Sequence, residues 1–215
     1  MINMPEQPLK NDLIVYNLSD ALAVAQKQFS SVDIPRQCQN SGALCSPEIV
    51  TLNYLNEIYR INIPTIEIAF VDSKQPVPLR DKILILHYFT QAKGMSLTGK
   101  QIPYRDLPGG LVYLPTFIKR TIEPLYEFFG KEPALLVGVG KMLGARPGTV
   151  GDASLIIDAF TRVPISVILW QGDDELNSEV NLLFDANILD YLTSEDVTIV
   201  CEIITWRLIN YAKKV

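Results

Sequence analysis

Several runs of β-forming residues in this sequence are joined by connections of only one or two residues. The connections include Asn56 and Pro64 in one part of the chain and Thr161–Arg162 in another. The runs are Ile49–Leu55, Glu57–Ile63, Thr65–Val71, Ser154–Phe160 and Val163–Trp170. Parallel neighbours need a crossover of about a dozen residues or more, whereas a tight turn can join antiparallel neighbours. The short connections therefore predict a predominantly antiparallel sheet, with Leu182–Asp185 as a further strand.

Stretches of helical composition lie before, between and after these runs. They are Asp20–Phe29, Leu79–Lys93, Thr116–Phe129, Pro133–Leu143 and Val197–Ala212. The second has a proline before its first turn, an apolar body and a glycine at its end, so we expect a largely buried helix. Strands on both sides of a helical middle predict the α+β class, a predominantly antiparallel sheet packed against several helices. A parallel α/β fold is the alternative.

Local signals place the loops and one helix start. The polar segment Arg36–Pro47, which carries two of the cysteines, and the segment Pro103–Gly110 are both expected to be loops. Pro124 should bend the helix that contains it. Thr193 and Asp196 form a capping-box pattern at the start of the last helix.

The length and composition indicate one compact unit. The chain has 215 residues, of which 48% are hydrophobic, and this is enough to bury one sizeable core. No repeat or low-complexity segment divides it. We therefore expect residues 1–215 to form a single domain, with residues 1–18 as an extended amino-terminal segment.

Net charge and hydropathy exclude two kinds of partner. The 19 basic and 24 acidic residues give a formal charge of −5, which lacks the basic excess that binds many phosphates. We expect no nucleic acid and no membrane as a partner, because no apolar stretch reaches the ~18 residues of a membrane-spanning helix. The first residues lack the basic and apolar regions of a signal peptide, which favours a cytoplasmic location.

The chain has three cysteines, Cys38, Cys45 and Cys201. An odd number leaves one thiol over in any pairing, which fits a reducing compartment better than a disulfide scaffold. The six residues between Cys38 and Cys45 also exceed the two to four of zinc-binding pairs. We therefore expect reduced thiols and no thiolate metal site.

The densest polar feature is an acidic segment after an apolar run. Asp173, Asp174 and Glu175 closely follow Trp170, and Asp185 comes ten residues after Glu175. Carboxylate oxygens suit Mg²⁺ or Ca²⁺, so one hypothesis is a divalent cation held by Asp173, Glu175 and Asp185. A solvated turn that closes a hairpin is the favoured interpretation, and a site paired with arginine is the third.

A glycine-rich loop offers a second candidate site. Gly109 and Gly110 expose backbone N–H groups and allow positive φ, so the loop can approach a ligand or bind an anion. An ordinary turn is the favoured alternative. Arg105 and Arg162 can form bidentate hydrogen bonds with the acidic segment or with a ligand anion, or they can be plain structural ion pairs.

Two further features are weaker candidates. The segment Gly138–Gly144 departs from the G-x-G-x-x-G spacing, and Lys141 has no Ser or Thr after it, so we reject nucleotide binding. His87 is the only histidine and lies in the apolar body of an expected helix. A packed core histidine is favoured there over a catalytic base or an axial ligand.

Several motifs together resemble a known family. They include Arg105-Asp-Leu-Pro-Gly-Gly, Arg162-Val-Pro, Leu169-Trp-Gln-Gly-Asp-Asp-Glu and Leu183-Phe-Asp-Ala-Asn. Their order is similar to that of an uncharacterised family, labelled a domain of unknown function, found mostly in anaerobic bacteria and archaea. The resemblance extends from about Asn53 to the carboxyl terminus. It implies a cytosolic domain of anaerobic metabolism that works beside iron–sulfur or corrinoid chemistry.

Strand ends and adjoining loops are where binding sites are usually built. We therefore expect the Gly109–Gly110 loop, the turn at Asp152, Arg162 and the acidic segment to converge. Trp170 ends an apolar run, and it is either a buried anchor, which is favoured, or a surface on which a ligand stacks.

Two function classes remain open. The favoured one is a non-catalytic accessory domain that binds a small molecule or a cofactor, and a protein partner is compatible with it. Its ligand-binding residues would be Arg105, Gly109, Gly110, Asp152, Arg162 and Trp170. The alternative is an enzyme that uses Asp173, Glu175 and Asp185 to hold a divalent cation, which activates water or polarises a substrate oxygen. The small supply of histidine and reactive cysteine favours the first.

Overall fold

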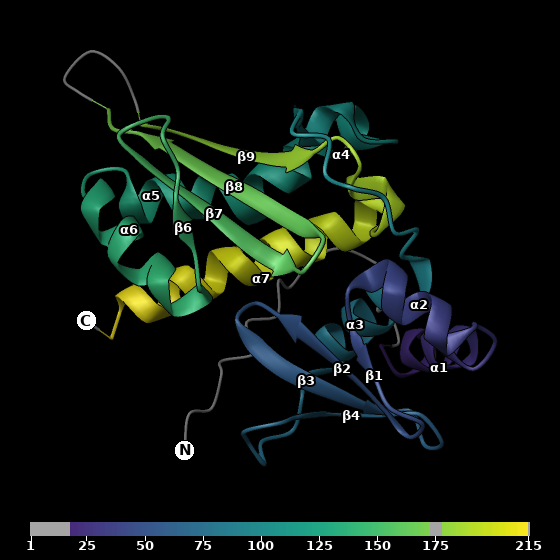
Figure 1. Ribbon diagram of the computed structural model, residues 1–215. Helices are drawn as coiled ribbons and strands as arrows, with labels where there is room; N and C mark the ends of the chain where they lie inside the picture. The colour runs from purple at the N-terminus through teal and green to yellow at the C-terminus, as the bar shows by residue number, and fades with distance from the viewer. Residues whose placement is uncertain (1–17, 173–177, 215) are drawn as a thin grey trace.

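The computed structural model describes residues 18–172 and 178–214 (Figure 1). In this part of the chain nine strands form one sheet. The strand order is β4-β3-β2-β7-β8-β9-β5, with β1 paired to β2 and β6 paired to β7. Every pair of neighbours is antiparallel. The predicted sheet is therefore confirmed, and the parallel alternative is wrong.

The elements follow one another in the order expected of an α+β protein, and that class is confirmed. The strands are β1 (Leu44–Cys45), β2 (Ile49–Tyr54), β3 (Glu57–Asn62), β4 (Glu67–Phe70), β5 (Gln101–Pro103), β6 (Arg146–Pro147), β7 (Ala153–Phe160), β8 (Val163–Trp170) and β9 (Glu179–Asp185). The helices are α1 (Leu18–Phe29), α2 (Ile34–Ser41), α3 (Leu79–Gln91), α4 (Gly110–Phe117), α5 (Glu123–Phe129), α6 (Pro133–Gly140) and α7 (Ser194–Ala212). A short 3₁₀ turn, Tyr104–Asp106, precedes α4.

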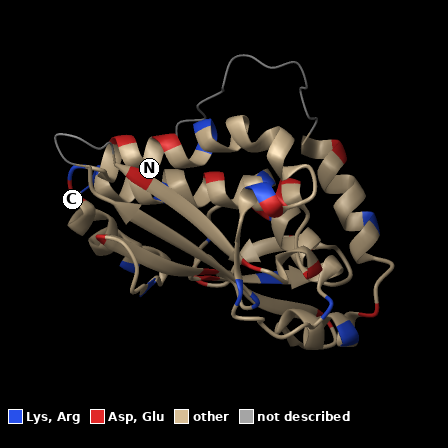
Figure 2. Cartoon of the chain, turned by 90° about the horizontal axis from the view of Figure 1, so that it is seen from above, with Lys and Arg blue, Asp and Glu red and all other residues tan. Residues whose placement is uncertain are grey.

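The sheet has two parts with different helical neighbours. Figure 1 shows the long α7 running along β7, β8 and β9, while α1, α2 and α3 gather beside β1–β4. Strands β7 and β8 are buried along most of their length, because nearly all of their side chains are apolar. Figure 2, which views the chain from above, shows the charged residues mainly on helices and loops. The core therefore lies between these strands and the helices that cover them.

The two parts of the sheet meet at a narrow joint. Strand β2 pairs with β7 through Tyr54 and Phe160, and the Leu55 N–H donates to the Ala159 carbonyl at 3.0 Å. The Tyr88 ring of α3 stacks on Phe160 with ring centroids 4.0 Å apart. Aromatic packing from α3 thus reinforces a joint that has few backbone hydrogen bonds.

A buried ion pair ties α3 to α7 beside this joint. Arg207 of α7 donates to Asp81 of α3 at 3.2 Å, and their side chains are only 15% and 5% exposed. The Tyr54 hydroxyl donates to the other Asp81 oxygen at 3.1 Å. Arg207 also bonds Glu57 of β3 at 2.9 Å, so this single guanidinium connects both helices to the sheet.

The segment Arg36–Pro47 was expected to be a loop, and this expectation is wrong. It contains most of α2 and the short strand β1. The Asp33 carboxylate accepts from the Arg36 N–H at 3.1 Å, and Pro35 occupies the first turn, so the helix has a regular start. Gly42 ends it with a φ of 73°, a left-handed conformation that favours glycine.

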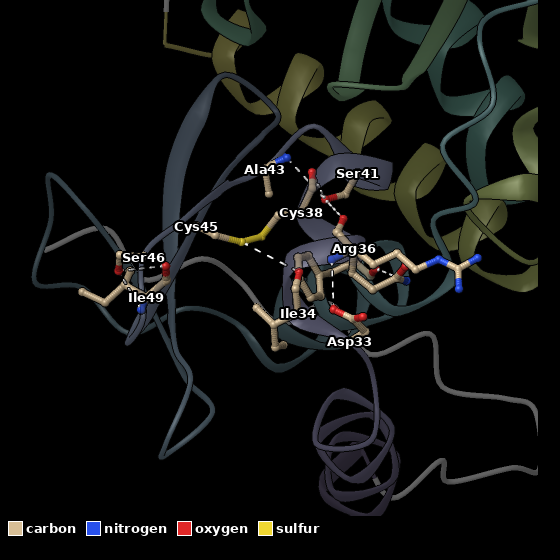
Figure 3. The surroundings of a disulfide bond; sticks show 11 residues. Asp33, Ile34, Arg36, Cys38, Ser41, Ala43, Cys45, Ser46 and Ile49 are labelled. Atoms are coloured by element: carbon tan, nitrogen blue, oxygen red, sulfur yellow. Dashed lines mark hydrogen bonds between the residues drawn. A yellow bond between two sulfur atoms is a disulfide. The ribbon is translucent and has the colours of Figure 1, made fainter.

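The expectation of reduced thiols is also wrong for two of the cysteines. Cys38 of α2 and Cys45 of β1 form a disulfide (Figure 3). The turn at Gly42 brings their Cα atoms to 6.2 Å, within the range that a disulfide spans. Cys201 on α7 is free and buried, and burial raises the pKa of its thiol well above the usual range.

The helix expected at Thr116 begins six residues earlier, at Gly110. Pro115 lies inside α4, where it removes one backbone hydrogen bond, and Leu111, four residues before it, is 71% exposed. Water can satisfy the carbonyl that Pro115 leaves free, so the proline does not end the helix here. A π-helical stretch, Ile118–Ile122, then leads to Pro124 at the start of α5, where the expected irregularity occurs.

The capping box of the last helix is confirmed. The Asp196 N–H donates to the Thr193 hydroxyl, and the Asp196 carboxylate accepts from the Thr193 N–H, both at 3.1 Å. Residues 1–17 lie outside the described part of the chain, and α1 begins at Leu18. Among the described residues, no helix is both long and apolar enough to cross a membrane.

Replacing Arg207 tests the ion pair that joins α3 to α7. Arg207→Met keeps most of the side-chain volume but leaves the Asp81 carboxylate buried without its cation. We expect a loss of about 3 kcal/mol in the free energy of unfolding, measured in urea. The control is Arg146→Met, which removes an exposed pair with Asp158 and should change stability by less than about 1 kcal/mol. Equal losses in the two variants would contradict the role given to Arg207.

Candidate functional site

The single histidine faces a cavity rather than the closed core, so the expectation of a packed core histidine is wrong. His87 lies on α3 with its side chain 24% exposed, and its Nδ1 is 2.8 Å from a carboxylate oxygen of Asp196. The Asp196 side chain is only 3% exposed. A buried carboxylate accepts hydrogen bonds only, so Nδ1 carries a proton, and within the described residues no carboxylate forms an ion pair with Nε2.

The cavity has a volume of about 680 Å³ and lies between α1, α3, the 104–113 segment and the first turn of α7. Much of its wall is apolar. The aliphatic side chains are those of Leu18, Ala21, Ile83, Leu84 and Ile199. Tyr104 and Tyr113 add aromatic surface, and Gln28 and Gln91 add amide groups. A mostly apolar hollow with a few polar groups is typical of a small-molecule site.

Two arginines line the cavity and share one carboxylate. Arg80 of α3 donates to Glu202 of α7 at 3.4 Å, and Arg120 donates to the same oxygen at 2.5 Å. Arg120 also donates to the Tyr113 hydroxyl at 3.0 Å. Its Nε is buried and has no hydrogen-bond partner within the described residues. Since two guanidinium groups face one carboxylate, the cluster has more donors than acceptors.

Hydrogen bonding shifts the pKa values of the His87 and Asp196 pair in opposite directions. The hydrogen bond to Asp196 raises the pKa of His87, although burial opposes this. Burial pushes the pKa of Asp196 up, but the bonds from His87 and Thr193 outweigh it and hold this pKa below its usual value. Each shift favours the charged form, so the pair is an ion pair over a wider pH range than isolated groups would be.

Asp196 connects the histidine to the start of α7. One of its oxygens bonds His87, and the other accepts from both the N–H and the hydroxyl of Thr193. The capping box therefore fixes the carboxylate that orients the imidazole. This arrangement places the histidine and the amino-terminal end of α7 on one wall of the cavity.

The predicted glycine loop lies at the edge of this cavity. Pro108 and Gly109 line it, and Gly109 has a φ of 71°. The Gly110 N–H donates to the Leu107 carbonyl at 2.8 Å, which closes an ordinary turn. A Cβ at Gly110 would lie 2.1 Å from the Tyr104 carbonyl oxygen, so only glycine fits there. The N–H of Gly110 is used by the turn and does not face a ligand.

The predicted convergence of site residues does not occur. Asp152 lies just before β7, beside Leu169 and Gln171, whereas Arg162 lies in the turn at the opposite end of β7 and β8. Eight residues of β8 separate the two ends by about 24 Å. The Arg162 Nε is buried without a partner among the described residues, close to Gly42. Neither residue lines the cavity.

The other two predicted ligand residues also lie elsewhere. Arg105 has a side chain that is 66% exposed and comes no closer than 3.9 Å to the Asp106 carboxylate. Trp170 is partly buried at the end of β8, where it pairs with Glu179. Of the predicted ligand-binding residues, only Gly109 lines the cavity.

Asp185, the described member of the predicted metal set, holds a loop. Its carboxylate accepts from the N–H groups of Thr98, Gly99 and Asn187 and from the Thr98 hydroxyl, at 2.8 to 3.1 Å. Burial raises its pKa, but these bonds outweigh burial and lower it. Asp185 also lies about 20 Å along β9 from Glu179, at the far end from the β8–β9 connection.

Asp173 and Glu175, the other two members of that set, lie outside the described residues. In the part of the chain that the structure describes, no group of three or more His, Cys, Asp or Glu side chains could hold a metal ion. The described residues therefore give a divalent cation no assembled site.

Comparison with known proteins assigns the family. The model of a domain of unknown function, DUF3786, matches residues 33–207, which is most of the chain. The chain belongs to this family. No curated protein and no solved structure matches it. The matched region of this DUF3786 domain includes α3, the glycine loop and α7 as far as Arg207, and thus most of the cavity wall.

Sequence reasoning missed the residues that cluster with His87. On α3, Arg80, Leu84, His87 and Gln91 are spaced by four, three and four residues, which puts them on one helical face. The three polar members of this stripe, Arg80, His87 and Gln91, were a visible signal in an otherwise apolar helix. Arg120 and Glu202 gave no comparable signal, because their contact joins segments that are 82 residues apart.

The His87 pair should make stability depend on pH. A raised pKa means that the pair stabilises the fold fully below the unfolded pKa of about 6.5, and the contribution is lost as pH rises through the folded pKa. We expect His87→Gln to lose more unfolding free energy, relative to the parent, at about pH 5.5 than at about pH 9. Urea unfolding at both pH values measures this. Since no other histidine is present, a pH-independent difference would contradict the pair.

Replacing Asp185 should destabilise the fold whether or not a divalent cation is present. Asp185→Asn removes the negative charge and substitutes a donor for one acceptor oxygen, so at least one N–H group loses its charged acceptor at a cost of about 2 kcal/mol. We expect the same loss in urea unfolding with and without Mg²⁺. Asp158→Asn, at an exposed ion pair, is the control and should stay within about 0.5 kcal/mol of the parent. A loss that appears only with Mg²⁺ would restore the metal hypothesis.

Proposed function

We propose that this DUF3786 domain is a non-catalytic ligand-binding domain, and that the cavity beside His87 is its binding site. The observation that carries the proposal is the placement of the only histidine, two arginines and a helix start around one mostly apolar hollow. Its volume of about 680 Å³ lies within the ~300–1,000 Å³ of typical small-molecule sites. The occupant is a small molecule or a cofactor.

The chemistry of the candidate nucleophiles and metal ligands supports binding over catalysis. Cys201 is buried with a raised thiol pKa, which disfavours the reactive thiolate, and Cys38 and Cys45 are joined to each other. The enzyme hypothesis relied on Asp185, whose oxygens are occupied by the 98–99 loop and Asn187. What supports the accessory role is therefore a formed cavity, together with the finding that the described residues assemble neither a reactive thiol nor a metal-binding cluster.

The cellular setting stays part of the proposal. The family resemblance suggests iron–sulfur or corrinoid metabolism in an anaerobe, and a cytoplasmic location is part of the same proposal. The Cys38–Cys45 disulfide argues against a strongly reducing compartment, unless the bond is transient there. A protein partner finds support in Leu111 and Val112, which are 71% and 88% exposed on α4 next to Tyr113 of the cavity.

A pair of substitutions on α1 tests whether the cavity binds ligands. Ala21 lines the cavity, so Ala21→Trp should fill part of it, whereas Ala23 is exposed and does not line it. The probe is Nile red, a neutral apolar dye that fluoresces on leaving water. We expect one dye per chain in the parent and in Ala23→Trp, and affinity at least about tenfold weaker in Ala21→Trp.

Far-UV circular dichroism should show the same helical content in both α1 variants. A parent protein that binds neither Nile red nor any of the charged probes described below would contradict the proposed function. Equal dye affinity in Ala21→Trp and Ala23→Trp would place the binding site elsewhere.

A further inference from the structure

We infer that the ligand of this cavity is an apolar molecule that ends in a carboxylate, received by Arg80 and Arg120 beside His87. The inference rests on the proposed function and adds the chemical class of the ligand. It follows from an excess of hydrogen-bond donors and positive charge at one part of a wall whose exposed surface is mostly apolar.

Arg80 is the most available cation. Its side chain is 47% exposed and lines the cavity, and its bond to Glu202 is long, at 3.4 Å. A guanidinium group has five N–H donors in a planar fork, so most of those on Arg80 stay open to a ligand. This fork matches the two oxygens of a carboxylate.

Arg120 also has N–H donors that a ligand could use. Two of its nitrogens bond Glu202 and Tyr113, while its buried Nε has no partner within the described residues. Each terminal nitrogen carries a second N–H, and the Arg120 side chain is 21% exposed, so these donors can serve a ligand that approaches beside Arg80. A cationic ligand would instead add to the donors already present.

The nearby acidic groups do not cancel this preference. Asp196 is saturated by His87 and Thr193, and Glu202 is divided between the two arginines. Glu195, the other acidic residue of the lining, is solvent-exposed, so water and salt screen it.

Two further features of the wall fit the same ligand. Ser194 and Glu195 place the first turn of the 19-residue α7 at the cavity, and a helix start favours negative charge. The aliphatic residues of α1, α3 and α7 provide surface for a hydrocarbon body. Together they describe an amphipathic molecule with one anionic end.

The test uses three probes with one hydrocarbon body and different end groups: 4-phenylbutyrate, 4-phenylbutanol and 4-phenylbutylamine. Isothermal titration of the full chain gives the three affinities. We expect the carboxylate to bind at least about tenfold more tightly than the alcohol, since one charge-assisted hydrogen bond is worth about that factor, and the amine to bind most weakly. Equal affinity for carboxylate and alcohol would overturn the inference.

Variants with opposite expected effects sharpen the test. Arg80→Gln should lower the affinity for 4-phenylbutyrate by about tenfold and leave the affinity for 4-phenylbutanol unchanged. Glu202→Gln removes the carboxylate that both guanidinium groups share, so it should raise the affinity for 4-phenylbutyrate severalfold. Arg146→Gln is the control, because Arg146 forms its ion pair with Asp158 and neither residue lines the cavity.

Each other result has a defined meaning. If Arg80→Gln weakens the alcohol as much as the carboxylate, Arg80 only shapes the cavity and the inference is wrong. If Glu202→Gln leaves the affinity for 4-phenylbutyrate unchanged or lowers it, the ligand does not use the excess of positive charge and the inference is wrong. If 4-phenylbutanol and Nile red bind but 4-phenylbutyrate binds no more tightly than the alcohol, the inference is wrong and the proposed function still stands. If none of the probes binds, the proposed function itself fails.

Discussion

The contact between α3 and α7 determines most of what this molecule can do, and the buried pair of Asp81 and Arg207 lies within it. Two further pairs, Arg80 with Glu202 and His87 with Asp196, join the same two helices. The first pair is almost fully buried, whereas the others border the cavity. Because a buried unpaired charge is costly, the first pair sets how α3 lies on α7, and the site follows from that placement.

This dependence matters because the sheet alone holds its two parts together weakly. Strand β2 meets β7 through Tyr54 and Phe160 and one further backbone bond to Ala159. Rings from Tyr54 and Tyr88 pack on Phe160, and the Tyr54 hydroxyl bonds Asp81. The joint of the sheet and the helical contact are thus one packed region, and residues of the same two helices, α3 and α7, also line the cavity.

The site reuses groups that already have structural roles. Asp196 completes the capping box of α7 and orients His87, and Glu202 holds two arginines while leaving donors open. Such double use explains how a chain with one histidine can present a polar cluster inside an apolar hollow. The glycine loop, for which an ordinary turn was the favoured interpretation over an anion site, serves mainly as a tight turn at the rim.

The sequence by itself determined the antiparallel sheet, the long helices and the capping box, because short connections, apolar periodicity and caps act between residues that are near in the chain. Helix α2 could also have been recognised from Asp33 and Pro35, but its polar composition hid it. Only the tertiary structure decided that His87 meets Asp196, 109 residues away, and that Arg162 and Asp152 lie at opposite strand ends. Local spacing sets which residues share a face, whereas packing of the whole core sets which faces meet.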